Sequence, residues 1–136
     1  MPTVDLPVGA VEYRVFGPDE PDNGTAVFVH GFLVNGHLWD AVAERLAAQG
    51  VRSIVPDWPL GAHRLPAAAD AELSPEAVAE SVLALLAALD LHDVTLVGSD
   101  TGGAICQLAL RGDHQRIGRL VLTNCDAFEH LSLIHT

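Results

Sequence analysis

An aspartate stands between small residues where the sequence predicts that a strand turns directly into a helix. The segment reads Gly98-Ser99-Asp100-Thr101-Gly102, with apolar runs on either side. So tight a turn forces its central residue into a strained backbone conformation, and glycines two positions away on each side leave room for it. We therefore expect Asp100 to project from the sheet edge at a helix N-terminus, where backbone N–H groups and the helix dipole favour an anion.

An aspartate at this point could act as a nucleophile. A serine needs a base to remove its proton, whereas a carboxylate is ionised at neutral pH and can attack an electrophilic carbon directly. The product is an ester on Asp100, which water activated by a histidine would hydrolyse while backbone N–H groups hold the oxyanion. The alternative is structural, since an aspartate after a strand can simply cap the next helix.

The elements around this segment alternate between strand and helix. Short, nearly continuous apolar runs indicate strands buried on both faces, and apolar residues at helical spacing indicate the helices between them. The expected strands are Val11–Phe16, Thr25–His30, Val51–Pro56, Val94–Gly98 and Arg119–Thr123, and the expected helices are Leu38–Gln49, Ser74–Leu89 and Gly103–Arg111. The pattern predicts an α/β fold with a doubly wound, mostly parallel sheet, whose functional loops follow the carboxyl ends of strands.

Three segments together resemble the α/β-hydrolase superfamily: His30-Gly31-Phe32 after a strand, Asp57 after the next one, and VGSDTGGA at positions 97–104. The aspartate resembles the branch of haloalkane dehalogenases and epoxide hydrolases. The resemblance implies that Asp100 is the nucleophile and that the backbones of Phe32 and Thr101 donate to the oxyanion.

The resemblance favours neither subfamily. Haloalkane dehalogenases usually carry a tryptophan where this chain has Thr101, and epoxide hydrolases usually carry a proline where it has Leu33. Asn35 is a candidate side-chain donor or a loop-turn residue. Trp58 is a candidate pocket residue or a packing residue.

The resemblance also implies a histidine base, late in the chain and beyond a helical cap domain. The chain offers only His130 and His135 near its end, and neither matches that position. Asp126 is a candidate for the acid that orients the base, with loop capping as the alternative. We therefore expect residues 1–126 to form a partial hydrolase core that lacks the cap and last strands, followed by an unassigned tail at 127–136. Enzyme activity of this chain stays open, with a catalytically inactive fragment or an interaction module as alternatives.

The composition limits the kinds of partner that the chain can bind. The formal net charge of −11 disfavours nucleic acid and membrane surfaces as partners, and the resemblance implies a small-molecule substrate. The two cysteines form no Cys-x-x-Cys pair, and we expect no metal and no cofactor. No signal peptide is recognisable, so the expected location is cytoplasmic. The sequence leaves the oligomeric state open.

Overall fold

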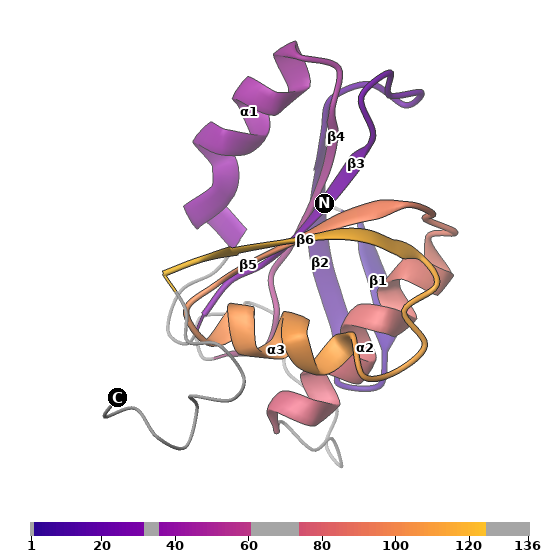
Figure 1. The fold of residues 1–136 in the computed structure, drawn as a ribbon, viewed down its shortest axis with the longest axis vertical. Helices are drawn as coiled ribbons and strands as arrows, with labels where there is room; N and C mark the ends of the chain where they lie inside the picture. The colour runs from indigo at the N-terminus through magenta and orange to yellow at the C-terminus, as the bar shows by residue number, and fades with distance from the viewer. Residues whose placement is uncertain (1, 32–35, 61–73, 125–136) are drawn as a thin grey trace.

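The computed structural model describes residues 2–31, 36–60 and 74–124, which form a six-stranded sheet with helices on both faces (Figure 1). The strands are β1 (Thr3–Leu6), β2 (Gly9–Phe16), β3 (Thr25–Val29), β4 (Arg52–Pro56), β5 (Val94–Ser99) and β6 (Ile117–Thr123). The helices are the 3-10 turn η1 (Gly36–Trp39), α1 (Asp40–Ala48), α2 (Pro75–Ala88) and α3 (Thr101–Ala109).

The strand order is β1-β2-β4-β3-β5-β6. Strands β4, β3, β5 and β6 are parallel to one another, whereas β1 and β2 join them as an antiparallel pair. The mostly parallel α/β sheet predicted from the sequence is therefore confirmed. The chain leaves β3 toward β4 but leaves β5 in the opposite direction, toward β6. The carboxyl ends of β3 and β5 thus meet at the switch point of the sheet, where open α/β sheets place their ligand crevice.

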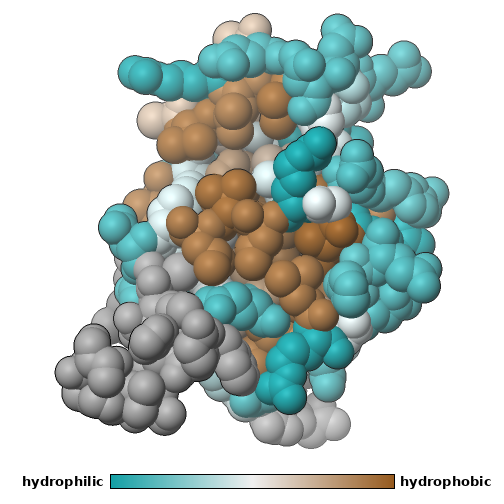
Figure 2. Space-filling model, viewed as in Figure 1, coloured by the Kyte–Doolittle hydropathy of each residue, from teal (hydrophilic) through white to brown (hydrophobic). Residues whose placement is uncertain are grey.

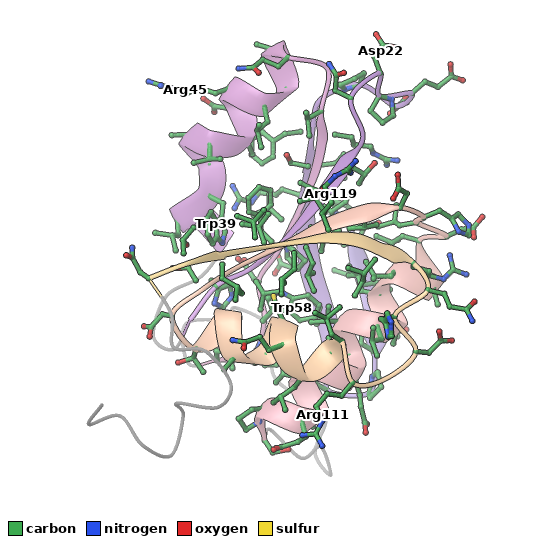
Figure 3. All side chains as sticks on the ribbon, viewed as in Figure 1. Asp22, Trp39, Arg45, Trp58, Arg111 and Arg119 are labelled. Atoms are coloured by element: carbon green, nitrogen blue, oxygen red, sulfur yellow. The ribbon has the colours of Figure 1, made fainter. Side chains whose placement is uncertain are left out.

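Two cores pack against the two faces of the sheet. The larger lies on the side of α2 and α3, where Trp58 is fully buried, and the smaller lies beneath α1 around Phe28 and Trp39 (Figure 3). The rings of Phe28 and Trp39 pack with centroids 4.9 Å apart. Helix α2 begins where the sequence predicts a helix start, because the side chain of Ser74 caps its first turn by accepting from the N–H of Ala77.

The structure also departs from the expected elements. Strand β1 was not expected, and it pairs with β2 through a turn of two residues. Helix α1 is preceded by a 3-10 turn, and α3 begins at Thr101 rather than at Gly103. No helix within the described residues has the length and apolar character needed to cross a membrane.

Candidate active site

Asp100 occupies a strained turn between β5 and α3. Its φ is 56° and its ψ is −129°. Asp90, Asp93 and Asn124 also have positive φ, but the ψ of Asp100 is far from the value near +47° of the left-handed helical region that aspartate tolerates. Such a conformation costs on the order of 1–3 kcal/mol and persists only where the surrounding structure enforces it. The strain expected from the sequence is present at Asp100.

Gly98 and Gly102 make the turn possible. A Cβ built on Gly102 would lie 2.1 Å from the carbonyl oxygen of Val29, and one built on Gly98 would lie 2.7 Å from the sulfur of Cys106. These separations are too short for any side chain. Helix α3 therefore approaches the end of β3 closely enough to bring Asp100 beside the His30–Gly31 turn.

The carboxyl group of Asp100 does not cap α3. The residue occupies the N-cap position, yet its side chain accepts no capping hydrogen bond, and it is exposed. It lies against Gly31 instead, where an added Cβ would stand 3.0 Å from Cβ of Asp100 and 3.2 Å from its Oδ2. The capping alternative considered for the sequence is thus not the arrangement in the structure.

The turn presents backbone donors next to this carboxyl group. The N–H of Thr101 opens α3 and has no acceptor within the helix, because the first N–H groups of any helix have none. The N–H of Asp100 donates to the carbonyl of Thr123 at 3.4 Å, which ties the turn to the end of β6. Phe32, expected to supply the second oxyanion donor, and Asn35 lie outside the described residues.

His30 is fully buried and holds the neighbouring turn together. Its Nε2 accepts from the backbone N–H of Trp58 at 2.8 Å, so Nδ1 is the ring nitrogen that carries the proton. Nδ1 donates to the carbonyl of Gly31 at 2.9 Å. Both ring nitrogens are thus engaged in fixing the backbone, and His30 is not placed as a base.

Asp57 has a structural connection that the sequence did not reveal. Its side chain is buried, and Oδ1 accepts from the N–H of Gly36 at 2.7 Å. The sequence marked Asp57 only as part of the family pattern, because its partner is distant in the chain.

Trp58 is fully buried, with its indole N–H donating to the carbonyl of Phe28 at 3.0 Å. This position matches the packing alternative for Trp58.

The other described histidines are engaged away from the turn. His37 bonds with Asp40, His92 with Asp90, and His114 with the carbonyl of Gly112. Asp126, His63, His130 and His135 lie outside the described residues. Across residues 2–31, 36–60 and 74–124, no three His, Cys, Asp or Glu side chains gather closely enough to hold a metal ion.

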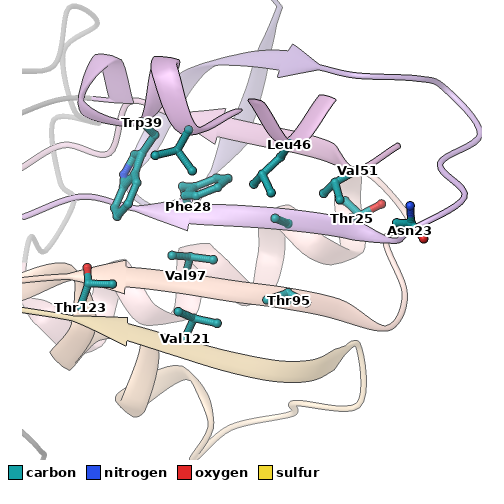
Figure 4. A pocket seen from close by; sticks show the side chains of 12 residues that line it. Asn23, Thr25, Phe28, Trp39, Leu46, Val51, Thr95, Val97, Val121 and Thr123 are labelled. Atoms are coloured by element: carbon teal, nitrogen blue, oxygen red, sulfur yellow. The ribbon is translucent and has the colours of Figure 1, made fainter. Parts of the chain in front are cut away.

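An apolar groove opens on the other face of the sheet, between α1 and β6. Its volume is about 420 Å³, and Figure 4 shows its lining side chains. The space-filling view shows apolar residues gathered on the side of the molecule that carries β6 (Figure 2), and Val121 of β6, which lines the groove, is 42% exposed. Among the described residues, the side chains that line the groove include no carboxylate, imidazole or thiol.

Comparison with known proteins agrees with this fold. Residues 26–133 match the family model described as alpha/beta hydrolase fold. A Mycoplasma pneumoniae protein named as an esterase/lipase is 34% identical over 104 residues, which cover 76% of this chain and 37% of that protein.

Solved structures share the fold. A hydrolase from Pseudomonas aeruginosa superposes with a TM-score of 0.78 at 27% identity, over 93% of this chain and 46% of that one. An esterase from Thermogutta terrifontis gives 0.77 at 24% identity, over 93% and 47%. An epoxide hydrolase from Vigna radiata gives 0.75 at 20% identity, over 89% and 38%, a likeness of fold alone. The chain thus spans less than half the length of these relatives.

Proposed function

This chain belongs to the alpha/beta hydrolase fold family, and we propose that Asp100 is the nucleophile of a hydrolase acting on a small electrophilic substrate. One observation carries the proposal. Asp100 keeps a strained backbone conformation while its exposed carboxyl group makes no capping bond. A residue that only capped the helix would gain that bond without the strain, so the strain points to a functional role.

The reaction follows from the chemistry of a carboxylate. An oxygen of Asp100 attacks a saturated carbon, and the bond from that carbon to a halide or to an epoxide oxygen breaks as the ester bond forms. Water that gives up a proton to a base, for which the family resemblance implies a histidine, then attacks the carbonyl carbon of the ester, so that the alcohol is released and the carboxylate is restored. In this proposal, the N–H of Thr101 stabilises the oxyanion of this second step.

The substrate class rests on the aspartate itself. An alkyl halide or an epoxide offers an electrophilic carbon. A carboxylate can attack this carbon directly, because the carboxylate is already ionised and has no proton to lose first. The Vigna radiata protein, which shares the fold, is an epoxide hydrolase. The esterase/lipase name of the Mycoplasma pneumoniae relative points to carboxylic esters as the competing substrate class.

The test is to incubate the chain with panels of alkyl halides, epoxides and carboxylic esters, and to examine the peptide that holds Asp100 by mass spectrometry. We expect an added mass on Asp100 with a halide or an epoxide, and none in Asp100→Asn. Asp113→Asn, which changes an exposed aspartate after α3, serves as the matched control and should retain the adduct. Hydrolysis of the carboxylic ester substrates that continues in Asp100→Asn would contradict the proposal.

A second candidate function is association with another polypeptide, and the apolar groove beside β6 favours it. β6 is the last strand of the described sheet, and an open edge with apolar residues beside it is a surface for pairing. Size-exclusion chromatography over a range of concentrations tests this candidate. An elution volume that does not change with concentration would count against self-association.

A further inference from the structure

The apolar groove between α1 and β6 begins next to the proposed nucleophile. Thr123 lines the groove, and its backbone carbonyl accepts from the N–H of Asp100 at 3.4 Å. On β5 the groove is lined by Thr95 and Val97, and residues two positions apart on a strand share a face of the sheet. The sheet face that forms the floor of the groove therefore leads along β5 to the turn that holds Asp100.

The groove follows the direction of the strands (Figure 4). Trp39 and Thr123 stand at the end that lies near the carboxyl ends of β3 and β5, and Asn23 stands at the far end. Because a strand rises about 3.3 Å per residue, Thr95 lies roughly 16 Å from Asp100 along β5. With carbon–carbon bonds of about 1.5 Å, an extended alkyl chain of roughly a dozen carbons spans that length.

The lining of the groove fits a ligand without charge. The polar residues among those described in the lining are all neutral, namely Asn23, Thr25, Thr95 and Thr123. A charged group placed against the apolar remainder would lose its hydration and gain no ion pair. The apolar surface of an alkyl chain, in contrast, is stabilised in proportion to the area that leaves water. An uncharged alkyl tail therefore matches this groove.

A hydrogen-bond donor without a partner lies at the Thr123 end of the groove. Trp39 is 8% exposed, and its indole Nε1 atom is buried with no acceptor among the described residues. A buried N–H without an acceptor costs free energy, and an acceptor that a ligand brings recovers that cost. The indole N–H of Trp58, in contrast, already donates to the carbonyl of Phe28 at 3.0 Å. This difference points to a ligand oxygen beside Trp39.

We propose that the groove binds the alkyl tail of the substrate. The tail lies along β5, the electrophilic head reaches Asp100, and the indole N–H of Trp39 donates to the oxygen of an epoxide head. The ligand is thus a neutral, long-chain amphiphile, of which a terminal alkyl epoxide is the simplest example. This inference rests on the proposed function of Asp100 and narrows its substrate class.

Binding of 1-decanol to the isotopically labelled full chain tests the groove without any reaction. 1-Decanol has an alkyl tail and a hydroxyl oxygen, but no leaving group that Asp100 could displace. The two tryptophans give two indole N–H resonances, and Trp39→Phe identifies the one that belongs to Trp39. We expect 1-decanol to shift the resonance of Trp39 and to leave that of Trp58 in place, because the Trp58 N–H is already bonded. No shift at Trp39, or equal shifts at both, would overturn the proposal.

The length of the substrate tail tests the part that the groove plays in the reaction. In a series from 1,2-epoxybutane to 1,2-epoxydecane, each added methylene should lower the concentration for half-maximal ester formation on Asp100 by about two- to fourfold. The maximal rate should change little, because the tail is bound equally before and during the attack. A half-maximal concentration that is the same for all lengths would overturn the tail site and leave the proposed function intact.

Val97→Phe and Val15→Phe form a matched pair of variants. Val97 lines the groove, whereas Val15 is exposed on β2 and lies outside the lining. The phenyl ring at position 97 fills part of the groove, so we expect the ratio of half-maximal concentrations for 1,2-epoxybutane and 1,2-epoxydecane to fall about tenfold or more. Val15→Phe should keep the ratio, which compares two substrates in one variant and so cancels a partial loss of folded protein. An unchanged ratio in Val97→Phe, or an equal fall in Val15→Phe, would contradict the tail site.

Val121→Asp changes the groove without adding volume to the core, since Val121 is 42% exposed and lines the groove. Its carboxylate would face the apolar tail, and we expect the same ratio to fall in this variant too. A Trp39 resonance that shifts with protein concentration and not with 1-decanol would assign the groove to a second copy of the chain and overturn the proposal. If no epoxide forms an ester, the proposed function fails, and the 1-decanol spectrum still decides whether the groove binds an alkyl tail.

Discussion

Gly31 lies in direct contact with the side chain of Asp100, across the junction between β3 and β5. A Cβ on Gly31 would stand 3.0 Å from Cβ of Asp100 and 3.4 Å from its Cγ. The two residues are 69 positions apart in the chain (100 − 31), and they meet because β3 and β5 pair with Val29 opposite Gly98. This contact makes the position of Asp100 sensitive to small changes at Gly31.

Gly31→Ala should separate activity from stability. Its φ is not positive, so alanine fits the backbone, and the added methyl group needs Asp100 to move by only a few tenths of an ångström. We expect the free energy of unfolding to change by less than about 1 kcal/mol. Ester formation on Asp100 should slow by about tenfold or more. Urea unfolding and adduct mass spectrometry measure the two effects, and an unchanged rate would show that the contact is not critical.

Gly102→Ala should destabilise the fold strongly. The methyl group would meet the carbonyl oxygens of Val29 and His30 at 2.1 and 2.6 Å, and these backbone atoms cannot move without disturbing β3. We expect a loss of about 3 kcal/mol in urea unfolding. Gly24→Ala is the control, because its Cβ meets nothing within 4 Å and only its φ of +90° is unfavourable. That variant should lose only about 1 kcal/mol. Equal losses would contradict the steric role of Gly102.

Asp100→Gly should stabilise the protein while abolishing the adduct. Glycine adopts a φ of 56° and a ψ of −129° without a Cβ clash, so the substitution relieves the strain of the turn. We expect a gain of about 1 kcal/mol in the free energy of unfolding. The same change at Asp5 in β1, which has no positive φ, should instead cost about 0.5–1 kcal/mol. A loss of stability in Asp100→Gly would argue that the turn is not strained.

Asp40 should contribute a small stabilisation that depends on pH. Partial burial raises the pKa of Asp40, but hydrogen bonds from His37 and Arg14 outweigh it and hold the pKa below its ordinary value. A carboxyl group with a lowered pKa in the folded state stabilises the fold above its unfolded pKa of about 3.9. That contribution is lost as the pH falls through the lowered value.

Urea unfolding at pH 7 and pH 3 measures this contribution. The unsubstituted chain should lose more stability between the two values than Asp40→Asn does, by less than about 1 kcal/mol, because Asp40 is partly exposed. Asp22→Asn, which changes an exposed aspartate in the β2–β3 turn, is the control and should follow the unsubstituted chain. An identical loss in Asp40→Asn would contradict the prediction.

The apolar groove beside β6 should bind hydrophobic dyes. Val121 lines it, and Val121→Asp would place a charge against apolar walls, so we expect a clear drop in the fluorescence of bound 8-anilinonaphthalene-1-sulfonate. Val15→Asp changes another exposed valine, on β2, and should leave the signal unchanged. Equal fluorescence in both variants would show that the dye binds outside the groove beside β6.

The sequence determined the parts of this protein that depend on local composition. Small residues around Asp100, apolar runs of strand length and the Ser74–Pro75 helix start are local signals, and each predicted the element that the structure contains. They were sufficient for the α/β fold class, the mostly parallel sheet and the strained turn at Asp100.

Only the tertiary structure decided the contacts between distant segments. The antiparallel pairing of β2 with β4, the position of Gly31 against Asp100 and the bonds of Asp57 to Gly36 and of Trp58 to His30 all join residues whose relation no local pattern encodes. The physical reason is that a carboxyl group or an imidazole ring can satisfy any nearby N–H group, and only the packing of the sheet determines which one is near.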